Sequence, residues 1–129
     1  MILDNKLGIT DQIELAKCEE KISKQKAKQL FDSDDIAHVE PGTFKGLSFI
    51  HTYLFAELYD FAGKIRTVNI AKGDFRFAPV MYLSPSLAHI DTLPQGDFDE
   101  IIEKYVEMNI AHPFREGKAT DVRLAFGWI

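Results

Sequence analysis

The stretch from residue 109 to residue 117 combines side chains that suit catalysis. It places His112 at the end of an apolar run, followed closely by Glu116 and Gly117. His112 is the side chain in this stretch that can take up a proton near neutral pH, and a glutamate carboxylate is an oxygen ligand that suits Mg²⁺. A new apolar run begins at Val122, so the loop leads toward a helix start, where unpaired amides and the helix dipole attract anions. A base, a metal ligand and an anion-binding loop together indicate phosphoryl or nucleotidyl transfer to a hydroxyl.

Each of these residues also has an ordinary structural interpretation. A histidine before a proline at a helix end can bond the last helical carbonyls, and a loop glutamate is usually solvated. The combination of the residues, and not any one of them, therefore carries the chemical interpretation.

The chain around this stretch is predicted to be mainly helical. Apolar residues recur at steps of three and four over residues 13–31, 47–58 and 98–110, which predicts three amphipathic helices. Asp11 is a candidate N-cap for the first helix, with Glu14 placed as its capping-box partner. The last helix must end near residues 111–113, because the residue before a proline avoids the α region.

Two shorter elements are expected between these helices. Apolar and polar residues alternate over 68–70 and again over 75–77, and the turn residues 71–74 lie between them, so we expect a small β-hairpin. Ser84 and Pro85 predict the start of a short helix that runs through Ile90, with the proline at the first helical position. The fold class is therefore mainly α with one small β-hairpin.

Composition narrows the class of protein. The chain has 129 residues, 46% of them hydrophobic, with 15 basic and 20 acidic residues and a net charge of −5. This size predicts one domain, and the negative charge argues against duplex DNA or an anionic membrane as the main partner. The single cysteine, Cys18, and the lack of a signal sequence or apolar span predict a cytoplasmic protein.

Residues 112–117 read HPFREG and resemble the first half of the signature of the Fic domain family, roughly HPFxEGNGRxxR. Three further segments also resemble the family: residues 61–66 are similar to the segment ahead of its hairpin, 70–78 to its hairpin flap, and 105–111 to the helix that enters the motif. The likeness extends over about residues 10–117.

This resemblance implies a Fic-type helical domain with a β-hairpin flap that acts as a protein adenylyltransferase. Such an enzyme moves AMP from ATP, bound with Mg²⁺, to a Tyr, Ser or Thr hydroxyl of a target protein. It implies that His112 is the base that deprotonates the hydroxyl, that Glu116 holds the Mg²⁺, and that Phe114 anchors the loop in the core. Gly117 would begin the anion-binding loop, where a side chain would block backbone approach to phosphate.

The resemblance also implies roles for the hairpin. Gly73, Asp74 and Phe75 would clamp an extended target segment by strand addition and deliver its hydroxyl to His112. Lys72 would reach the nucleotide, although a solvated turn lysine is an equally good interpretation.

The signature changes after Gly117, where the family has Asn-Gly-Arg. Aligned without a gap, Lys118 begins the substituted residues and Arg123 keeps the final arginine; with two residues deleted, Lys118 replaces the first arginine and Asp121 the last. Lys118 and Arg123 are the candidate phosphate-binding side chains. Because lysine lacks the bidentate contact of arginine, we expect weak AMP transfer or none.

Three functional alternatives follow from this change. The first is a Fic adenylyltransferase with impaired activity, and the second is a catalytically inactive module that binds a target strand through its hairpin. The third keeps the fold but transfers a phosphoryl or phosphocholine group. The dense apolar end, residues 122–129, suggests that residues 1–129 are a single Fic-like domain lacking its C-terminal part, with a second copy or an inhibitory protein as a further partner.

Overall fold

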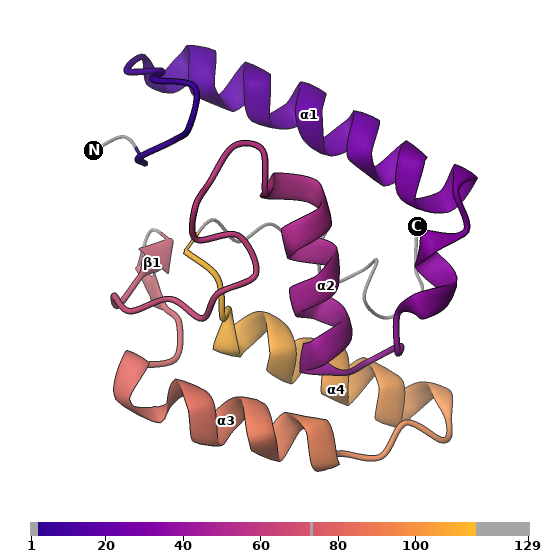
Figure 1. Cartoon of the computed structure of the whole chain (residues 1–129). Coiled ribbons are helices and arrows are strands. Elements are labelled where there is room, and N and C mark those ends of the chain that lie inside the picture. The colour runs from indigo at the N-terminus through magenta and orange to yellow at the C-terminus, as the bar shows by residue number, and fades with distance from the viewer. Residues whose placement is uncertain (1–2, 73, 116–129) are drawn as a thin grey trace.

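The structure is a computed structural model, and it describes residues 3–72 and 74–115. It confirms a mainly helical fold with a small antiparallel hairpin. Figure 1 shows α1 at the top, α3 at the bottom, and α2 and α4 between them. In chain order the elements are α1 (Gln12–Asp32), the 3₁₀ helix η1 (Asp35–His38), α2 (Phe44–Phe55), β1 (Ala71–Lys72), β2 (Phe75–Arg76), α3 (Val80–Thr92) and α4 (Phe98–Ala111).

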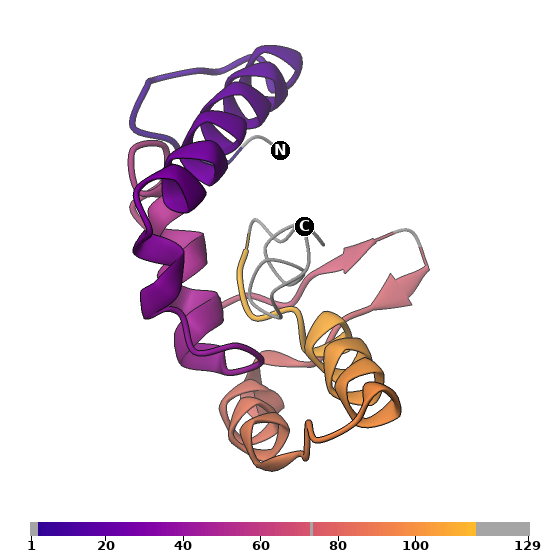
Figure 2. The same ribbon diagram turned by 90° about the vertical axis from the view of Figure 1, so that its right-hand side faces the viewer.

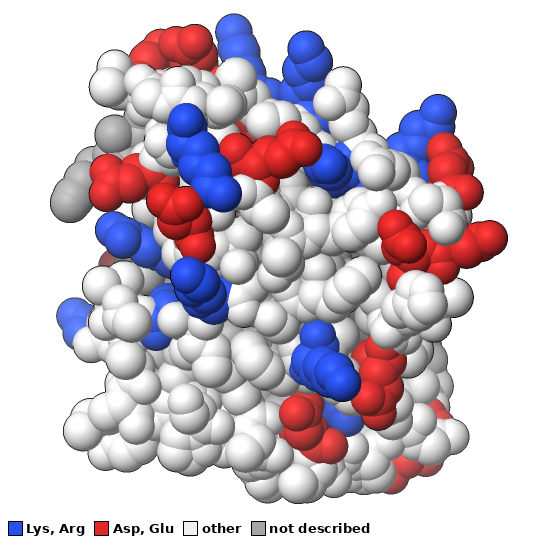
Figure 3. All heavy atoms as spheres, viewed as in Figure 1, with Lys and Arg blue, Asp and Glu red and all other residues white. Residues whose placement is uncertain are grey.

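The helix α1 begins at the predicted cap. The Asp11 carboxylate accepts the amide of Ile13 at 3.2 Å, and not that of Glu14 as a capping box would require. Leu15 and Leu30 are buried on its inner face. Its outer face carries charges of both signs, which Figure 3 shows mixed together over the top of the molecule. The lower left of the same view is largely uncharged.

The helix α2 forms the centre of the core. Thr43 caps it by accepting the amide of Gly46 at 3.0 Å. Its apolar side chains pack against those of the other helices and of the segment that follows it. Buried apolar residues are Leu15, Leu30, Leu47, Ile50, Leu54, Phe55, Leu58, Tyr59, Leu83, Leu87, Ile90, Met108, Ala111 and Phe114.

The prediction that a helix starts at Ser84 and Pro85 is wrong, because α3 begins four residues earlier at Val80. Pro79 is the N-cap, and the amide of Val80 donates to Asn69 Oδ1 at 2.8 Å. This contact comes from a distant part of the chain and stabilises an earlier helix start than the local pattern indicates. Pro85 lies inside the helix on its exposed side, where water can reach the carbonyl left without its amide partner.

The helix α4 matches its predicted bounds closely. Asp97 caps it with a full capping box: the Asp97 carboxylate accepts the amide of Glu100 at 2.9 Å, and the Glu100 carboxylate accepts the amide of Asp97 at 3.2 Å. It ends at Ala111, with His112 as the C-cap.

The strands of the hairpin are shorter than predicted, and the first one lies later in the chain than residues 68–70. Ala71 pairs with Arg76 and Lys72 with Phe75, so residues 71 and 72, expected in the turn, belong to the first strand. The amide of Phe77 donates to the carbonyl of Ile70 at 3.2 Å and extends the ladder toward the base of the hairpin. Figure 2 shows the hairpin projecting above α4, on the side of the molecule away from α1.

Across the described residues, no helix has the length and apolar character needed to cross a membrane.

Candidate active site at the end of α4

His112 adopts an unusual backbone conformation at the end of α4. Its φ of 50° and ψ of 70° lie in the left-handed region, and its amide donates to the carbonyl of Met108 at 3.0 Å. A residue with a Cβ pays about 1–2 kcal/mol to enter this region. Surrounding contacts must therefore hold His112 in place.

Arg66 supplies the main contacts to this turn. Its side chain is 3% exposed and makes its hydrogen bonds to backbone carbonyls. Nε donates to His112 O at 2.7 Å, and Nη2 donates both to Ala111 O at 2.9 Å and to Ala78 O at 2.6 Å. Nη1 donates to Val68 O at 2.9 Å. Burial lowers the pKa of the Arg66 guanidinium below the ordinary arginine value, because desolvation disfavours the charged form.

The backbone joins the same segments directly. The amide of Arg66 donates to Pro113 O at 2.8 Å, and the amide of Ala78 donates to Ile110 O at 3.2 Å. The end of α4 is therefore attached both to the segment before the hairpin and to the segment after it.

The imidazole of His112 is covered by the hairpin. The ring of Phe77 stacks on it with centroids 4.1 Å apart and planes 21° apart. Phe75 meets Phe77 edge-on with centroids 5.1 Å apart, and half of Phe75 is exposed. A row of three rings thus leads from the surface of the hairpin to His112.

Phe114 is a core anchor, as the resemblance implied. It is buried and stacks on His51 with centroids 4.1 Å apart, and on Phe44 with centroids 5.9 Å apart. His51 is itself fully buried, and its Nδ1 accepts the amide of Gly63 at 2.8 Å. The ring stack therefore ties the turn after α4 to α2 and to the loop that follows α2.

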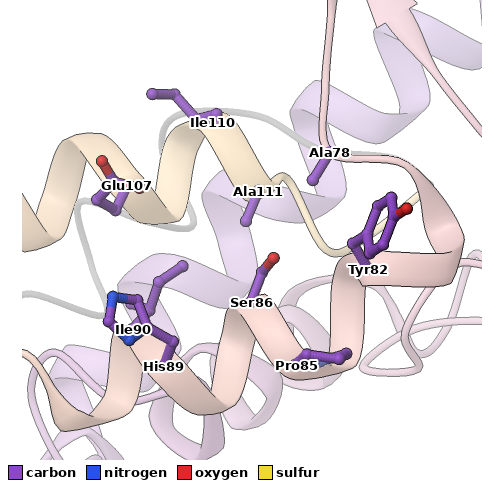
Figure 4. Close-up of a pocket in the computed structure, with 9 residues that line it drawn as sticks. All are labelled: Ala78, Tyr82, Pro85, Ser86, His89, Ile90, Glu107, Ile110 and Ala111. Carbon is purple, nitrogen blue, oxygen red and sulfur yellow. The ribbon is translucent and has the colours of Figure 1, made fainter.

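Two cavities lie near this junction. Figure 4 shows the first, of about 450 Å³, between α3 and α4, with Ser86 of α3 pointing toward Ala111. It is lined by Ala78, Tyr82, Pro85, Ser86, His89, Ile90, Glu107, Ile110 and Ala111. The second, of about 420 Å³, lies beside the hairpin and is lined by Asn69, Ile70, Ala71, Asp74, Arg76, Phe77 and Pro79.

Comparison with known families shows which protein family has this sequence. Residues 42–128, most of the chain, match the family described as Fic/DOC. The chain belongs to the Fic/DOC family.

Individual relatives agree with this assignment. The chain is 28% identical over 95% of its length to "Protein adenylyltransferase VbhT" of Bartonella schoenbuchensis, of which it spans 27%. Its fold superposes with a TM-score of 0.78 on the N-terminal Fic domain of a Bep effector from Bartonella sp. AR 15-3, at 23% identity, covering 97% of this chain and 65% of that one. BepC from Bartonella tribocorum, solved with bound AMPPNP, gives a TM-score of 0.75 at 20% identity, covering 98% of this chain and 71% of that one.

The structure describes only some of the predicted site residues. His112, Asp74 and Phe75 are described, as is the backbone of Lys72. His112 meets the hairpin through Phe77, and Phe75 reaches it through the same ring. Asp74 lines the cavity beside the hairpin. The predictions for Gly73, Glu116, Gly117, Lys118 and Arg123 fall outside the described residues.

Three residues of this Fic site were not singled out from the sequence. Phe77 could have been found, because strand alternation places it on the same face as Phe75. His51 also carries a signal, since it falls on the apolar helical positions of α2. Arg66 carries only a weak signal, as a lone arginine at the end of the segment that resembles the family. Its four carbonyl acceptors come together only in the folded chain.

Proposed function

We propose that this Fic domain is a protein adenylyltransferase that moves AMP from Mg-ATP to a Tyr, Ser or Thr hydroxyl of a target protein. The observation that carries the proposal is His112, held in a left-handed turn beneath the hairpin within the Fic sequence HPFREG. Support also comes from VbhT, which is called a protein adenylyltransferase, and from BepC, which was solved with AMPPNP.

In the proposed reaction, His112 acts as the general base. The target hydroxyl oxygen forms a bond to the α-phosphorus of ATP, the bond from that phosphorus to the bridging oxygen of the β-phosphate breaks, and pyrophosphate leaves. The hydroxyl proton passes to the imidazole of His112, whose ring is held in place by Phe77.

The hairpin is proposed to hold the target. In the described part of the chain the sheet has two strands, β1 and β2, so each strand has an outer edge with open backbone groups. An extended target segment could pair with such an edge, close to Gly73, Asp74 and Phe75. The exposed half of Phe75 offers an apolar contact to that segment.

The nucleotide and its metal are assigned to the motif loop. Within the described residues, no group of three or more His, Cys, Asp or Glu side chains could hold a metal ion. A Mg²⁺ ion at the motif loop would take most of its ligands from the nucleotide. That is the usual mode for Mg²⁺, and the Glu116 carboxylate is the matching protein ligand. Bound there, the ion would neutralise phosphate charge. Gly117, Lys118, Arg123 and Lys72 are the proposed phosphate contacts.

A second function is favoured by one feature of the sequence. Aligned without a gap, Lys118, Ala119 and Thr120 stand where the Fic signature has Asn-Gly-Arg; with two residues deleted, Lys118 replaces the first arginine and Asp121 the last. Losing an arginine that stabilises transition-state charge can slow phosphoryl transfer by about 10³-fold. The alternative is therefore an inactive module that still binds a target strand through its hairpin.

The test is labelling of candidate target proteins by the full chain with ATP radiolabelled at the α-phosphate and Mg²⁺. Label that is lost in His112→Ala but retained in His89→Ala, a histidine on α3 with an exposed position, supports the transferase. Calorimetry with Mg-ATP separates the alternatives: nucleotide binding supports the transferase, whereas target binding without nucleotide binding supports the inactive module.

A further inference from the structure

We propose that Arg66 is the positioning residue that fixes His112 relative to the hairpin, an assignment that rests on the proposed function of this site. Arg66 is not proposed to contact the nucleotide or the target hydroxyl. Its role is to hold the backbone of His112 and both ends of the hairpin in one arrangement.

The geometry of the guanidinium carries this proposal. Its three nitrogens each donate to a carbonyl, and the acceptors belong to three segments that are separate in the sequence. Val68 precedes the hairpin, Ala78 follows it, and Ala111 and His112 end α4. One rigid planar group therefore sets the spacing between the hairpin base and the catalytic turn.

The electrostatics explain why an arginine is needed. The last carbonyls of a helix carry partial negative charge, and those of α4 point at the buried guanidinium. Within the described residues, the ion pairs found do not involve Arg66. Its charge lies against four backbone carbonyl dipoles, so the cation serves to orient backbone.

The strained backbone explains why His112 depends on Arg66. His112 has a positive φ without being glycine, and its carbonyl accepts from Arg66 Nε at 2.7 Å. Without this bond the turn can relax toward an ordinary conformation, and the imidazole would leave the face of Phe77. Lysine keeps the charge but has a single nitrogen, which cannot reach carbonyls in three segments with the spacing of a guanidinium.

The experiment compares Arg66→Lys and Arg66→Gln in the full chain, with Arg76→Gln as the matched control because Arg76 is an exposed arginine on the hairpin itself. NMR follows the ring signals of His112 and the exchange rates of two amides, Phe77 at the hairpin base and Leu54 in α2. We expect both Arg66 variants to shift the His112 ring signals. We also expect Phe77 exchange to rise about tenfold more than Leu54 exchange, because the hairpin base opens locally.

The control should leave the His112 ring signals and both exchange rates as they are in the unmodified chain. Unchanged His112 signals in both Arg66 variants would overturn the proposal. So would Phe77 and Leu54 exchange rates that rise together, because that result indicates a role in global stability alone. Full rescue by Arg66→Lys would show that charge suffices, and this too contradicts a positioning role for the guanidinium fork.

A measurement on the unmodified chain covers the case in which the variants do not fold. We expect a scalar coupling between Arg66 Nε and the carbonyl carbon of His112, transmitted through the hydrogen bond to His112 O. We also expect slow rotation of the guanidinium. A freely rotating guanidinium without that coupling would overturn the proposal. None of these readouts needs nucleotide or target, so they stay informative if AMP transfer is not observed. Where transfer is observed, Arg66→Lys should lower kcat and leave KM for ATP within about twofold.

Discussion

Replacing Gly63 by alanine should disturb the support beneath the motif loop. Gly63 has a φ of +77°, and a Cβ built there would overlap Thr52 Oγ1 and lie 3.1 Å from the carbonyl oxygen of Ser48. The amide of Gly63 donates to Nδ1 of His51. His51 is the ring on which Phe114 stacks, so the disturbance is transmitted toward the motif.

The size of the effect can be estimated from these contacts. Placing a side chain at positive φ costs about 1–2 kcal/mol. Pushing the Gly63 amide away from the buried His51 leaves a polar group without its partner, which costs about 1–3 kcal/mol. We therefore expect Gly63→Ala to lower the free energy of unfolding by about 3 kcal/mol. The melting temperature should fall by about 4 °C for each kcal/mol lost.

Two further variants separate the contributions to this loss. Gly8 also has a positive φ, of 69°, but a Cβ built there meets nothing within 4 Å, so Gly8→Ala measures the conformational cost alone. Thr52→Ala removes the Oγ1 that would overlap the new Cβ. The four chains with and without Gly63→Ala and Thr52→Ala form a double-mutant cycle, measured by urea unfolding followed by circular dichroism.

Gly63→Ala must cost clearly more than Gly8→Ala, and adding Thr52→Ala must recover part of the difference. Equal losses at Gly63 and Gly8, or no coupling between Gly63 and Thr52, would refute the packing argument. The loss at Gly63 would then come from its positive φ alone.

Two other substitutions test the ends of α4. Asp97→Ala removes the capping box with Glu100 and should lower the free energy of unfolding, measured in urea, by about 1 kcal/mol. Asp97→Asn should lose less. No measurable loss in Asp97→Ala would show that the cap does not stabilise α4. Phe77→Ala removes the ring stacked on His112, so the His112 ring-proton signals should move downfield in NMR spectra. Phe98 is a largely exposed residue at the start of α4, and Phe98→Ala should leave these signals in place. Unmoved signals in Phe77→Ala would show that the stack does not form in solution.

Much of the fold could be predicted from local sequence patterns. The bounds of α4 follow from its apolar spacing and from Pro113, both of which act within a few residues. The start of α3 could not be predicted in this way, because Val80 is stabilised by Asn69 from the other side of the hairpin. The hairpin itself was expected, but its two-residue strands depend on pairing and on contacts at its base.

Some residues of the candidate site could likewise be identified from the sequence, and others could not. His112 and Phe114 stand in a contiguous motif, and the sequence identified both. The assignments of Glu116, Gly117 and the residues after them remain predictions, as does the assignment of residues 1–129 to one domain. Arg66 and His51 act on the motif from 46 and 63 residues away in the chain, respectively, and no local pattern connects them to it.

The family and the chemical types at residues 112–117 can be identified from the sequence, because the order and spacing of side chains in a short motif do not depend on the fold. The left-handed turn at His112, the ring of Phe77 over its imidazole and the bond from Arg66 to its carbonyl are seen only in the folded chain. A strained backbone and a buried guanidinium are each unfavourable alone. They become stable together once the end of α4 and both ends of the hairpin have packed against one another.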